Sequence, residues 1–333
     1  MTRPLCLMTG ATGALGPAVV TALARTHDIR TFSRHAPPAG LFREPVVAFT
    51  GDIADHAAVR RAASGSDALV HLAALLHIVN PGPGMRPEYE RVNVEGTRAV
   101  VEAALSEGVS RVVILSTIAV YGSSGGTVLS EDSKPHPDTA YGETKLAAER
   151  IALEARRADG TPLATVLRAA AVYGPRVKGN YRALVDAIAS GRFVPVGRGD
   201  NRRTLVFEED LASAIALAVE HPAAAGRIYN VSDGQFHAMR DIIAAIARGF
   251  GRRSRGWHLP VAVVRPAVRL GSLFDQRLAG TLDKYLEDVA VEGRRIQHEL
   301  GFRPQFDLER GWTATIEQIR RARPGTAVGD VFQ

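Results

Sequence analysis

The sequence predicts an α/β protein: a doubly wound parallel sheet with a smaller, mostly helical lobe toward the C-terminus. Two observations support this fold class. Short apolar runs alternate with longer helical patterns over the first 175 residues, and a glycine-rich turn directly follows the first apolar run. Strands separated by helices form parallel βαβ units. Because such crossovers are right-handed, they place helices on both faces of the sheet.

The elements can be assigned in chain order. Apolar runs predict strands in the first half at 5–10, 28–34, 45–53, 68–74, 111–117 and 161–174. The helical patterns between them lie at 16–26, 56–64, 89–108 and 140–157. Beyond residue 175 we expect helices at 180–192 and 211–222, a strand at 226–233 and a mostly helical remainder at 235–333. The predicted division is a sheet domain of residues 1–175 and 204–232, and a lobe of residues 176–203 and 233–333.

The composition is that of a globular protein, with 46% hydrophobic and 23% charged residues in a chain of 333. Cys6 is the only cysteine and lies in the first apolar run, where we interpret it as core filling. The absence of disulfides fits a reducing compartment, so we expect a cytoplasmic protein. The apolar stretch 259–274 is interrupted by Arg265 and Arg269. We interpret it as a buried or partner-facing helix, without stable membrane insertion.

The net charge of +6 favours anionic partners. Nucleic acid is not expected, because no aromatic residues are interleaved with the basic clusters at 198–203, 252–255 and 320–323. The ten histidines are scattered, without the spacing of metal ligands, so no catalytic metal is predicted. His71 lies inside an apolar strand and is interpreted as a core residue. A phosphorylated metabolite remains as the anionic partner.

The turn "TGATGALG" predicts a dinucleotide site. Gly10, Gly13 and Gly16 lie between the first strand and the first helix. Glycines at this spacing allow a tight turn and a close backbone approach, so the N-terminus of the helix can receive a pyrophosphate.

The end of the second strand bears on which dinucleotide is bound. An acidic residue there would bond the ribose 2′-hydroxyl of NAD, whereas this chain has Ser33 followed by Arg34. A small hydroxyl and a fixed positive charge suit a 2′-phosphate. NADP is therefore the expected cofactor, with NAD as the alternative. Asp52, at the end of the third strand, is placed to bond the adenine amino group.

Tyr141 and Lys145 are the candidate catalytic pair. They lie four residues apart in a helical pattern, which is one turn, so their side chains share a face. The chain has 7 tyrosines and only 4 lysines, so roughly 0.1 chance matches at this spacing are expected. Thr117 ends the strand 111–117, and in open α/β sheets ligands bind at that edge.

Eight motifs in this order resemble the extended short-chain dehydrogenase/reductase family, also called the NAD-dependent epimerase/dehydratase family. They are "TGATGALG", "GDI", "HLAA", "VNVEGT", "LSTIAVYG", "YGETK", "LRAAAVYGP" and "RRTLVFEEDLASAI", and they span essentially the whole chain. The resemblance implies a Rossmann-type sheet and a homodimer formed through the helices at 89–108 and 140–157. It implies cofactor contacts from Gly10, Thr12, Gly13, Ala14, Leu15, Gly16, Ser33, Arg34, Asp52, Ile53, Leu72, Ala73, Ala74, Asn93, Tyr141 and Lys145.

The same resemblance implies catalytic roles for Thr117, Tyr141 and Lys145. Tyr141 would be the general acid/base, and an unperturbed tyrosine has a pKa of about 10. A lysine ammonium at about 4 Å contributes roughly 4 kcal/mol, which would lower that pKa by up to about three units. Lys145 would also bond the nicotinamide ribose, and Thr117 would hydrogen-bond the reacting oxygen. Asn93 would support the helix beside the nicotinamide.

A nucleotide-diphosphate sugar is the expected substrate. In the resemblance Arg203 binds the pyrophosphate, Asn180 contacts the diphosphate, and the segment 191–197 with Val196 lies along the base. Thr117 and Ile118 complete the substrate contacts. A guanidinium suits a diphosphate, and an apolar substrate such as a steroid would not need it. Three consecutive alanines in "LRAAAVYGP" depart from the family pattern and leave the sugar open.

The reaction class follows from two further positions. Family dehydratases place carboxylates directly after the Ser/Thr, but this chain has Ile118 and Ala119 there, so dehydration is not expected. The pair Ser33–Arg34 favours NADP and therefore a reductase of a 4-keto nucleotide sugar. A 4-epimerase with tightly bound NAD stays open as the alternative. A dinucleotide-sensing module without catalysis is a third reading, which the intact Tyr141–Lys145 pair disfavours.

Overall fold

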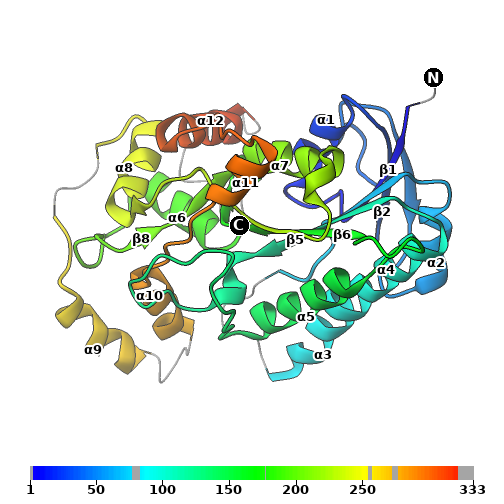
Figure 1. The fold of residues 1–333 in the computed structure, drawn as a ribbon. Coiled ribbons are helices and arrows are strands. Elements are labelled where there is room, and N and C mark those ends of the chain that lie inside the picture. Colours follow the sequence, from blue (N-terminus) through cyan, green and yellow to red (C-terminus); the bar gives the residue numbers. More distant parts are fainter. Residues whose placement is uncertain (1–2, 77–82, 177, 254–256, 272–276, 322–333) are drawn as a thin grey trace.

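The computed structural model describes residues 3–76, 83–176, 178–253, 257–271 and 277–321. Its centre is a seven-stranded sheet in the order β10-β6-β5-β4-β1-β2-β3, with every pairing parallel (Figure 1). The strands are β1 (Leu5–Thr9), β2 (Asp28–Ser33), β3 (Val46–Thr50), β4 (Ala68–His71), β5 (Arg111–Thr117), β6 (Ala164–Ala169) and β10 (Ile228–Val231). The predicted fold class is confirmed.

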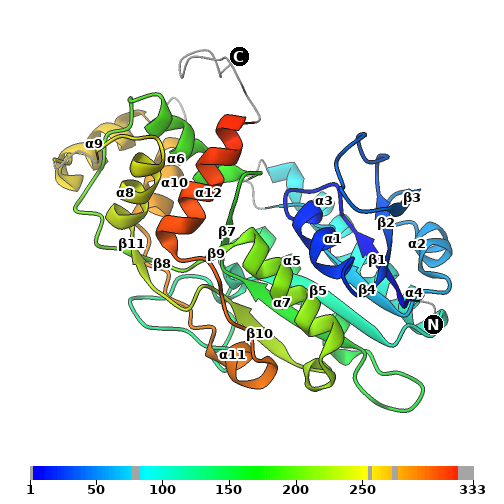
Figure 2. The same ribbon diagram turned by 90° about the horizontal axis from the view of Figure 1, so that it is seen from above.

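Helices cover both faces of the sheet, and each face has its own buried core (Figure 2). On one face, apolar residues of β1, β5 and β6 pack against α1 (Gly16–Leu23), α7 (Glu208–Glu220) and α11 (Arg294–Leu300). On the other, they pack against α2 (His56–Ala63), α4 (Gly96–Ser106) and α5 (Ala140–Glu154). Apart from the edge strand β3, which is largely exposed, the strands are mostly buried and therefore read as continuous apolar runs in the sequence.

Two predicted elements are interrupted. The expected helix at 89–108 is α3 (Arg86–Tyr89), a π-helical turn (Glu90–Glu95) and α4. The expected strand at 161–174 is β6 followed by β7 (Ala171–Tyr173), which leaves the main sheet and pairs in parallel with β9 (Leu205–Phe207). Both interruptions lie near the candidate site. Of the two, the π-helical turn is a feature that is frequent at functional sites.

A third buried cluster lies outside the sheet. It joins α6 (Gly179–Ala189), α8 (Met239–Gly249) and α12 (Leu308–Arg321) around Trp312, whose ring stacks on Tyr173 at 4.6 Å. Beside it β8 (Arg202–Arg203) pairs antiparallel with β11 (His237–Ala238). The remaining elements are α9 (Val261–Gly271), α10 (Arg277–Leu286) and the 3-10 turns Pro83–Met85, Ile118–Tyr121 and Pro222–Ala224. The exact division into two domains stays a prediction.

The stretch at 259–274 differs from expectation. Its described part forms α9, which begins at Val261 and is largely exposed, with Val263 63% accessible. The apolar residues made burial the natural interpretation, but the helix lies at the edge of the molecule (Figure 1). Whether a partner covers it stays a prediction, and residues 272–274 lie outside the described residues.

Candidate active site

The glycine turn after β1 has no room for side chains. Gly10 has φ +73°, and a Cβ there would lie 2.5 Å from the backbone nitrogen of Ala73, just beyond β4. A Cβ on Gly16 would lie 1.7 Å from the carbonyl oxygen of Ala11. Both positions therefore require glycine. The turn is pressed against residues 72–73, as a close-packed nucleotide-binding turn would be.

The start of α1 offers the positive end of a helix dipole to an anion. Helix α1 begins at Gly16 with Pro17 in its first turn, and its N-cap, Leu15, makes no side-chain capping bond. The Gly16 N–H is bonded to the Gly13 carbonyl at 3.3 Å and Pro17 has no N–H, so the attraction for an anion comes mainly from the helix dipole. The remaining predicted residues of the turn, Thr12, Gly13 and Ala14, are half-buried beside it.

The ends of β2 and β3 place the predicted adenosine-side residues. Ser33 is 8% exposed, and its buried Oγ has no hydrogen-bond partner among the described residues, whereas Arg34 is exposed. Asp52 accepts from Arg91 Nη1 at 2.8 Å. The backbone N–H of Ala54, and then Arg91, lower the pKa of Asp52. Sequence reasoning did not find Arg91, which would compete with an adenine amino group for that carboxylate.

The catalytic candidates meet at the carboxyl end of β5. Tyr141 and Lys145 lie on α5, whose start is fixed by Thr139 Oγ1 accepting from the Gly142 N–H at 3.1 Å. Lys145 is 2% exposed. Thr117, the last residue of β5, is hydrogen-bonded to Tyr141 through its side chain. The structure therefore brings together the three residues that the sequence assigned to catalysis.

The expected lowering of the Tyr141 pKa is wrong for this structure. Burial raises the pKa of Tyr141 to about 12, although the bond with Thr117 lowers it in part. Burial also lowers the pKa of Lys145 to about 8, opposed by the charge of Glu149. The sequence argument used a partly solvated ammonium, whereas both groups here lose hydration and both charged forms are disfavoured.

Buried polar residues hold the catalytic helix from behind. Asn93, in the π-helical turn, accepts from the backbone N–H of Leu75 at 2.8 Å and donates to Thr144 Oγ1 at 3.1 Å. It thereby connects the segment after β4 to α5. His71 is hydrogen-bonded to Thr9 and Thr97 through its two ring nitrogens, and burial lowers its pKa to about 3. His71 is thus a neutral core residue, as predicted.

The remaining predicted cofactor residues line the same edge of the sheet. Leu72 donates its N–H to the Thr9 carbonyl at 3.1 Å, and the Ala73 N–H lies 3.5 Å from Thr9 Oγ1. Ile53 is 6% exposed and packs against Gly96, where a Cβ would meet its side chain. Ala74 is half-buried directly after them.

Arg203, the predicted diphosphate residue, is mostly buried. Its side chain is 11% exposed and lies 3.9 Å from Glu287, and it donates to the backbone carbonyls of Lys284 and Tyr285. Its Nε is buried without a hydrogen-bond partner among the described residues. The charge of Arg203 lowers the pKa of Tyr181 and of Tyr285, although burial raises both. An arginine beside two phenols is thus the centre of this end of the site.

The other predicted substrate residues differ in how close they lie to Arg203. Val196 forms an isolated parallel bridge with Leu259, and its backbone lies next to the side chain of Tyr285. Asn180 is exposed at the start of α6, and Ile118 is half-buried in the turn after β5. The structure therefore groups Arg203 with Val196 through Tyr285, and leaves Asn180 at the surface.

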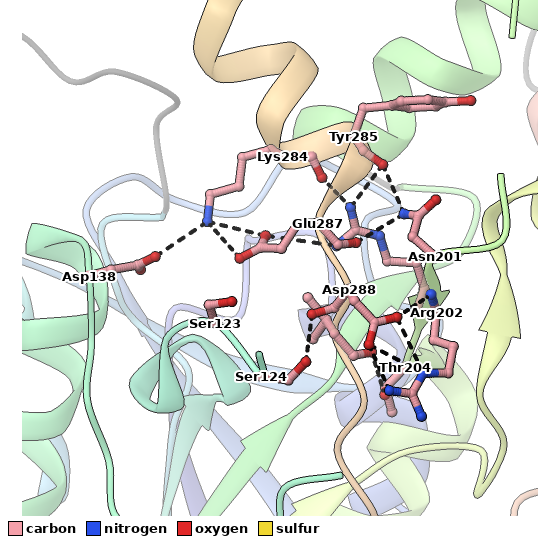
Figure 3. Close-up of polar contacts among 12 residues, drawn as sticks. Ser123, Ser124, Asp138, Asn201, Arg202, Thr204, Lys284, Tyr285, Glu287 and Asp288 are labelled. Carbon is pink, nitrogen blue, oxygen red and sulfur yellow. Dashed lines mark hydrogen bonds and ion pairs between the residues drawn. The ribbon is translucent and has the colours of Figure 1, made fainter. Parts of the chain in front are cut away.

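A C-terminal segment that sequence reasoning missed ties the two ends of the site together (Figure 3). Asp288 accepts from Arg202 Nη2 at 2.7 Å, and its carbonyl accepts from Ser124 Oγ at 2.7 Å. Lys284 lies 3.3 Å from Glu287 and 3.9 Å from Asp138, in the loop before α5. The segment from 284 to 288 therefore lies between the Arg202–Arg203 strand and the loop that leads to Tyr141.

Sequence reasoning also missed a buried ion pair one helical turn from Lys145. Glu149 follows it by one helical turn and forms a buried ion pair with Arg168 of β6, with Arg168 Nη2 and Glu149 Oε2 2.7 Å apart. The i, i+4 spacing from Lys145 was a visible signal. The partner was not, because only the pairing of β5 with β6 brings Arg168 to this helix.

Metal and membrane sites are not found in the part of the chain that the structure describes. Its residues contain no group of three or more His, Cys, Asp or Glu side chains placed to hold a metal ion. Among the helices described, none is long and apolar enough to cross a membrane.

The fold and the comparisons with known proteins together define an NAD-dependent α/β enzyme and name its family. The chain belongs to the NAD dependent epimerase/dehydratase family, whose model matches residues 6–232. The UDP-glucose 4-epimerase of Vibrio cholerae is 28% identical over 324 residues, which cover 95% of each chain. A 3 beta-hydroxysteroid dehydrogenase/Delta 5-->4-isomerase of Mycobacterium tuberculosis is 28% identical over 335 residues, covering 93% of this chain and 89% of that one. MoeE5 in complex with UDP-glucuronic acid and NAD is 28% identical, with a TM-score of 0.76, and covers 96% of this chain and 99% of its own.

Proposed function

We propose that this chain is an NAD(P)-dependent oxidoreductase that acts on a nucleotide-diphosphate sugar, most directly by reducing a 4-keto sugar. The observation that carries the proposal is the meeting of Thr117, Tyr141 and Lys145 at the carboxyl end of β5. That edge lies next to the glycine turn, since β4 alone separates β5 from β1. Catalytic groups and cofactor turn thus face one crevice, the usual ligand site of open α/β sheets.

The cofactor assignment rests on the cradle after β1. The turn fits a pyrophosphate, because only backbone atoms approach its glycines and the positive end of the α1 dipole lies beside it. Ser33, with its buried and unpartnered Oγ, and the exposed Arg34 suit a 2′-phosphate, which supports NADP. The NAD in the MoeE5 complex supports NAD. When bound, the dinucleotide supplies or accepts the hydride.

The residues of this chain supply the proton. Reduction of a ketone needs an acid at the oxygen, and Tyr141, with its pKa raised to about 12, is protonated at neutral pH. Its phenol donates to the oxygen on which charge develops, and Thr117 hydrogen-bonds the same oxygen. Lys145 beside them provides positive charge when protonated. The protonated state of Tyr141 therefore favours the reductive direction.

The substrate assignment rests on Arg203 and its neighbours. An arginine that is mostly buried, with Nε unpartnered among the described residues, suits a diphosphate, and Tyr181, Tyr285 and the segment at Val196 suit a base. The bound UDP-sugar in MoeE5 and the substrate of the V. cholerae relative agree with this class. The V. cholerae relative favours the second candidate, a 4-epimerase that retains NAD.

The first test uses purified protein. We expect it to release no stoichiometric NAD on denaturation, to bind NADPH more tightly than NADH, and to oxidise NADPH when given a UDP-4-keto sugar. Stoichiometric bound NAD, together with interconversion of UDP-glucose and UDP-galactose, would replace the reductase by the epimerase. Turnover of a 3β-hydroxysteroid, without response to any UDP-sugar, would overturn the substrate class.

We also propose a cytoplasmic homodimer, as the sequence predicts. Burial raises the pKa of the lone Cys6 thiol to about 12, which makes it inert and suits a core position. The dimer would form through α4 and α5. Sedimentation at micromolar concentration tests it, and a monomer at that concentration would contradict it.

A further inference from the structure

Glu149 is a buried carboxylate on the catalytic helix α5, and it has no role in the chemistry described so far. It is 1% exposed and lies one helical turn after Lys145. It is held on two sides. Ser116 Oγ, one residue before Thr117, donates to its Oε1 at 2.5 Å, and Arg168 Nε and Nη2 donate to its two oxygens at 3.0 and 2.7 Å.

The arginine is itself fixed by further buried partners. Arg168, 3% exposed, donates from Nη1 to the Tyr121 hydroxyl at 2.9 Å and lies 4.8 Å from the centre of that ring. Tyr121 in turn donates to Asn230 Oδ1 at 2.8 Å. Both carboxylate oxygens and the guanidinium thus have partners without any help from solvent. The position of Glu149 is therefore rigid.

Stability alone is a poor explanation for this arrangement. Burying two charges carries a desolvation cost that their attraction often only offsets, and apolar residues of similar volume commonly do as well. A chain that keeps such a pair directly behind its catalytic lysine has another use for it.

The groups around Lys145 show what that use is. On its own helix the titratable neighbours are Tyr141 and Glu149, and Tyr141 is protonated. From β4 it faces His71, which burial keeps neutral. The packed elements β5 and the π-helical turn contribute uncharged side chains, Ser116, Thr117 and Asn93. From β6 comes a cation, Arg168, which is paired with Glu149. Among the described residues, Glu149 is the negative charge that acts on Lys145, and it opposes the effect of burial on the lysine pKa.

We propose that Glu149 is a positioning residue that keeps Lys145 protonated in its buried site, and that Ser116 and Arg168 hold Glu149 in place for this. The inference rests on the proposed function only in that Lys145 is taken to act as a cation. Burial without a counter-charge drives a lysine toward the neutral amine. A neutral Lys145 would give Tyr141 no positive neighbour.

The test measures the protonation of Lys145 directly. The chain has four lysines, Lys134, Lys145, Lys178 and Lys284, and of these Lys134 and Lys178 are exposed and Lys284 is half-buried. In protein labelled with ¹³C-lysine, four Cε signals are therefore followed against pH, and a Lys145→Arg variant identifies the signal of interest. No substrate is needed.

The variant Glu149→Gln removes the charge and keeps the shape. We expect the pKa of Lys145 to fall below its wild-type value by about one to three units. A purely structural role predicts the opposite sign, because loosened packing admits water and moves the pKa back up toward an ordinary lysine. A pKa in folded Glu149→Gln that is unchanged or higher would overturn the proposal.

Matched variants control for folding and for distance. Glu143→Gln changes a half-buried carboxylate of the same helix, paired with Arg86, and is expected to leave the Lys145 pKa unchanged. Glu149→Asp keeps the charge and should restore most of the pKa. If Glu149→Gln does not fold, the double variant Glu149→Gln/Arg168→Met removes both buried charges, and the Lys145 pKa is again expected to fall.

Activity assays separate this inference from the proposed function. If Glu149→Gln lowers the Lys145 pKa but keeps wild-type turnover, the inference is supported and a catalytic Lys145 is contradicted. If Glu149→Gln leaves the Lys145 pKa unchanged and the protein still reduces a 4-keto sugar, the inference is overturned and the proposed function stands.

Discussion

Two arginine–carboxylate pairs flank the candidate site, and they differ in burial. Glu149 and Arg168 are 1% and 3% exposed, and they join a helix to the central sheet behind Lys145. Arg202 and Asp288 are 34% and 27% exposed, and they join β8 to the C-terminal segment (Figure 3). Their closest N–O distances are the same, 2.7 Å.

The difference shows that geometry alone does not define the role of an ion pair. At the catalytic end the pair is desolvated, so its charges act strongly on neighbours and breaking it leaves an unpaired buried charge. At the lobe end water screens the pair, and its contribution is mainly to hold a chain segment in place. The two ends of the site should therefore respond differently to the same kind of substitution.

The largest effect is expected at the catalytic end, from Tyr141→Phe. Loss of the acid should lower kcat by about 10²- to 10⁴-fold while cofactor binding stays intact. Steady-state kinetics with a UDP-4-keto sugar and NADPH titration by fluorescence measure the two. Retained turnover would show that Tyr141 is not the acid. The lobe end around Arg203 would then be the better-supported half of the site.

Breaking the buried pair comes next. Arg168→Met leaves Glu149 unpaired, and we expect the free energy of unfolding to fall by about 3–5 kcal/mol. Urea denaturation followed by circular dichroism measures it. The matched variant at the lobe end, Arg202→Met, should cost no more than about 1 kcal/mol. Equal losses in the free energy of unfolding for the two variants would contradict the expected difference between the buried and the more exposed ion pair.

At the lobe end Arg203→Met should weaken substrate binding rather than chemistry. A hydrogen bond to a charged group is worth about 1.5–3 kcal/mol, so KM should rise about 10- to 150-fold with kcat little changed. A fall in kcat at constant KM would mean that Arg203 affects the chemical step, so that substrate binding at the lobe end cannot be separated from chemistry at the catalytic end. Arg198→Met, an exposed neighbour paired with Asp200, is the control and should leave KM unchanged.

The smallest effect is a pH dependence at Asp288. Its hydrogen bonds with Arg202 lower its pKa, so the folded state releases this proton more readily than the unfolded chain. The stabilisation is therefore present above the unfolded pKa of about 4 and is lost as pH falls through the folded pKa. Urea denaturation at neutral pH and in acid should show a smaller acid loss for Asp288→Asn than for wild type. An identical loss would mean that solvent screens the pair fully.

The predictions from sequence succeeded where a feature lies within one element. The glycine turn and the Tyr141–Lys145 spacing are set by local chain geometry, so they could be placed on a turn and a helix without knowing the fold. The parallel sheet followed from alternation along the chain. The family resemblance is likewise carried by short contiguous motifs, and the match over residues 6–232 confirms it.

The sequence was less informative where burial or a distant segment decides the outcome. The segment of α9 was expected to be buried or to face a partner. Its apolar content did not reveal that it is largely exposed in this chain, and its covering by a partner stays a prediction. The π-helical turn around Asn93 depends on the bonds of that side chain to residue 75 and to Thr144, from two other segments.

The sequence by itself determined the order of strands and helices, and it predicted the glycine turn and the candidate catalytic residues, because these depend on spacings of a few residues. Only the tertiary structure decided the charge environment of those residues. The pKa of Tyr141 follows mainly from desolvation, and that of Lys145 follows from desolvation and from Glu149, which Arg168 of β6 holds in place. Arg203 meets residues 284–287, which are remote in the chain. Electrostatic energies depend on distance in space and on exclusion of water, and neither is written in local sequence.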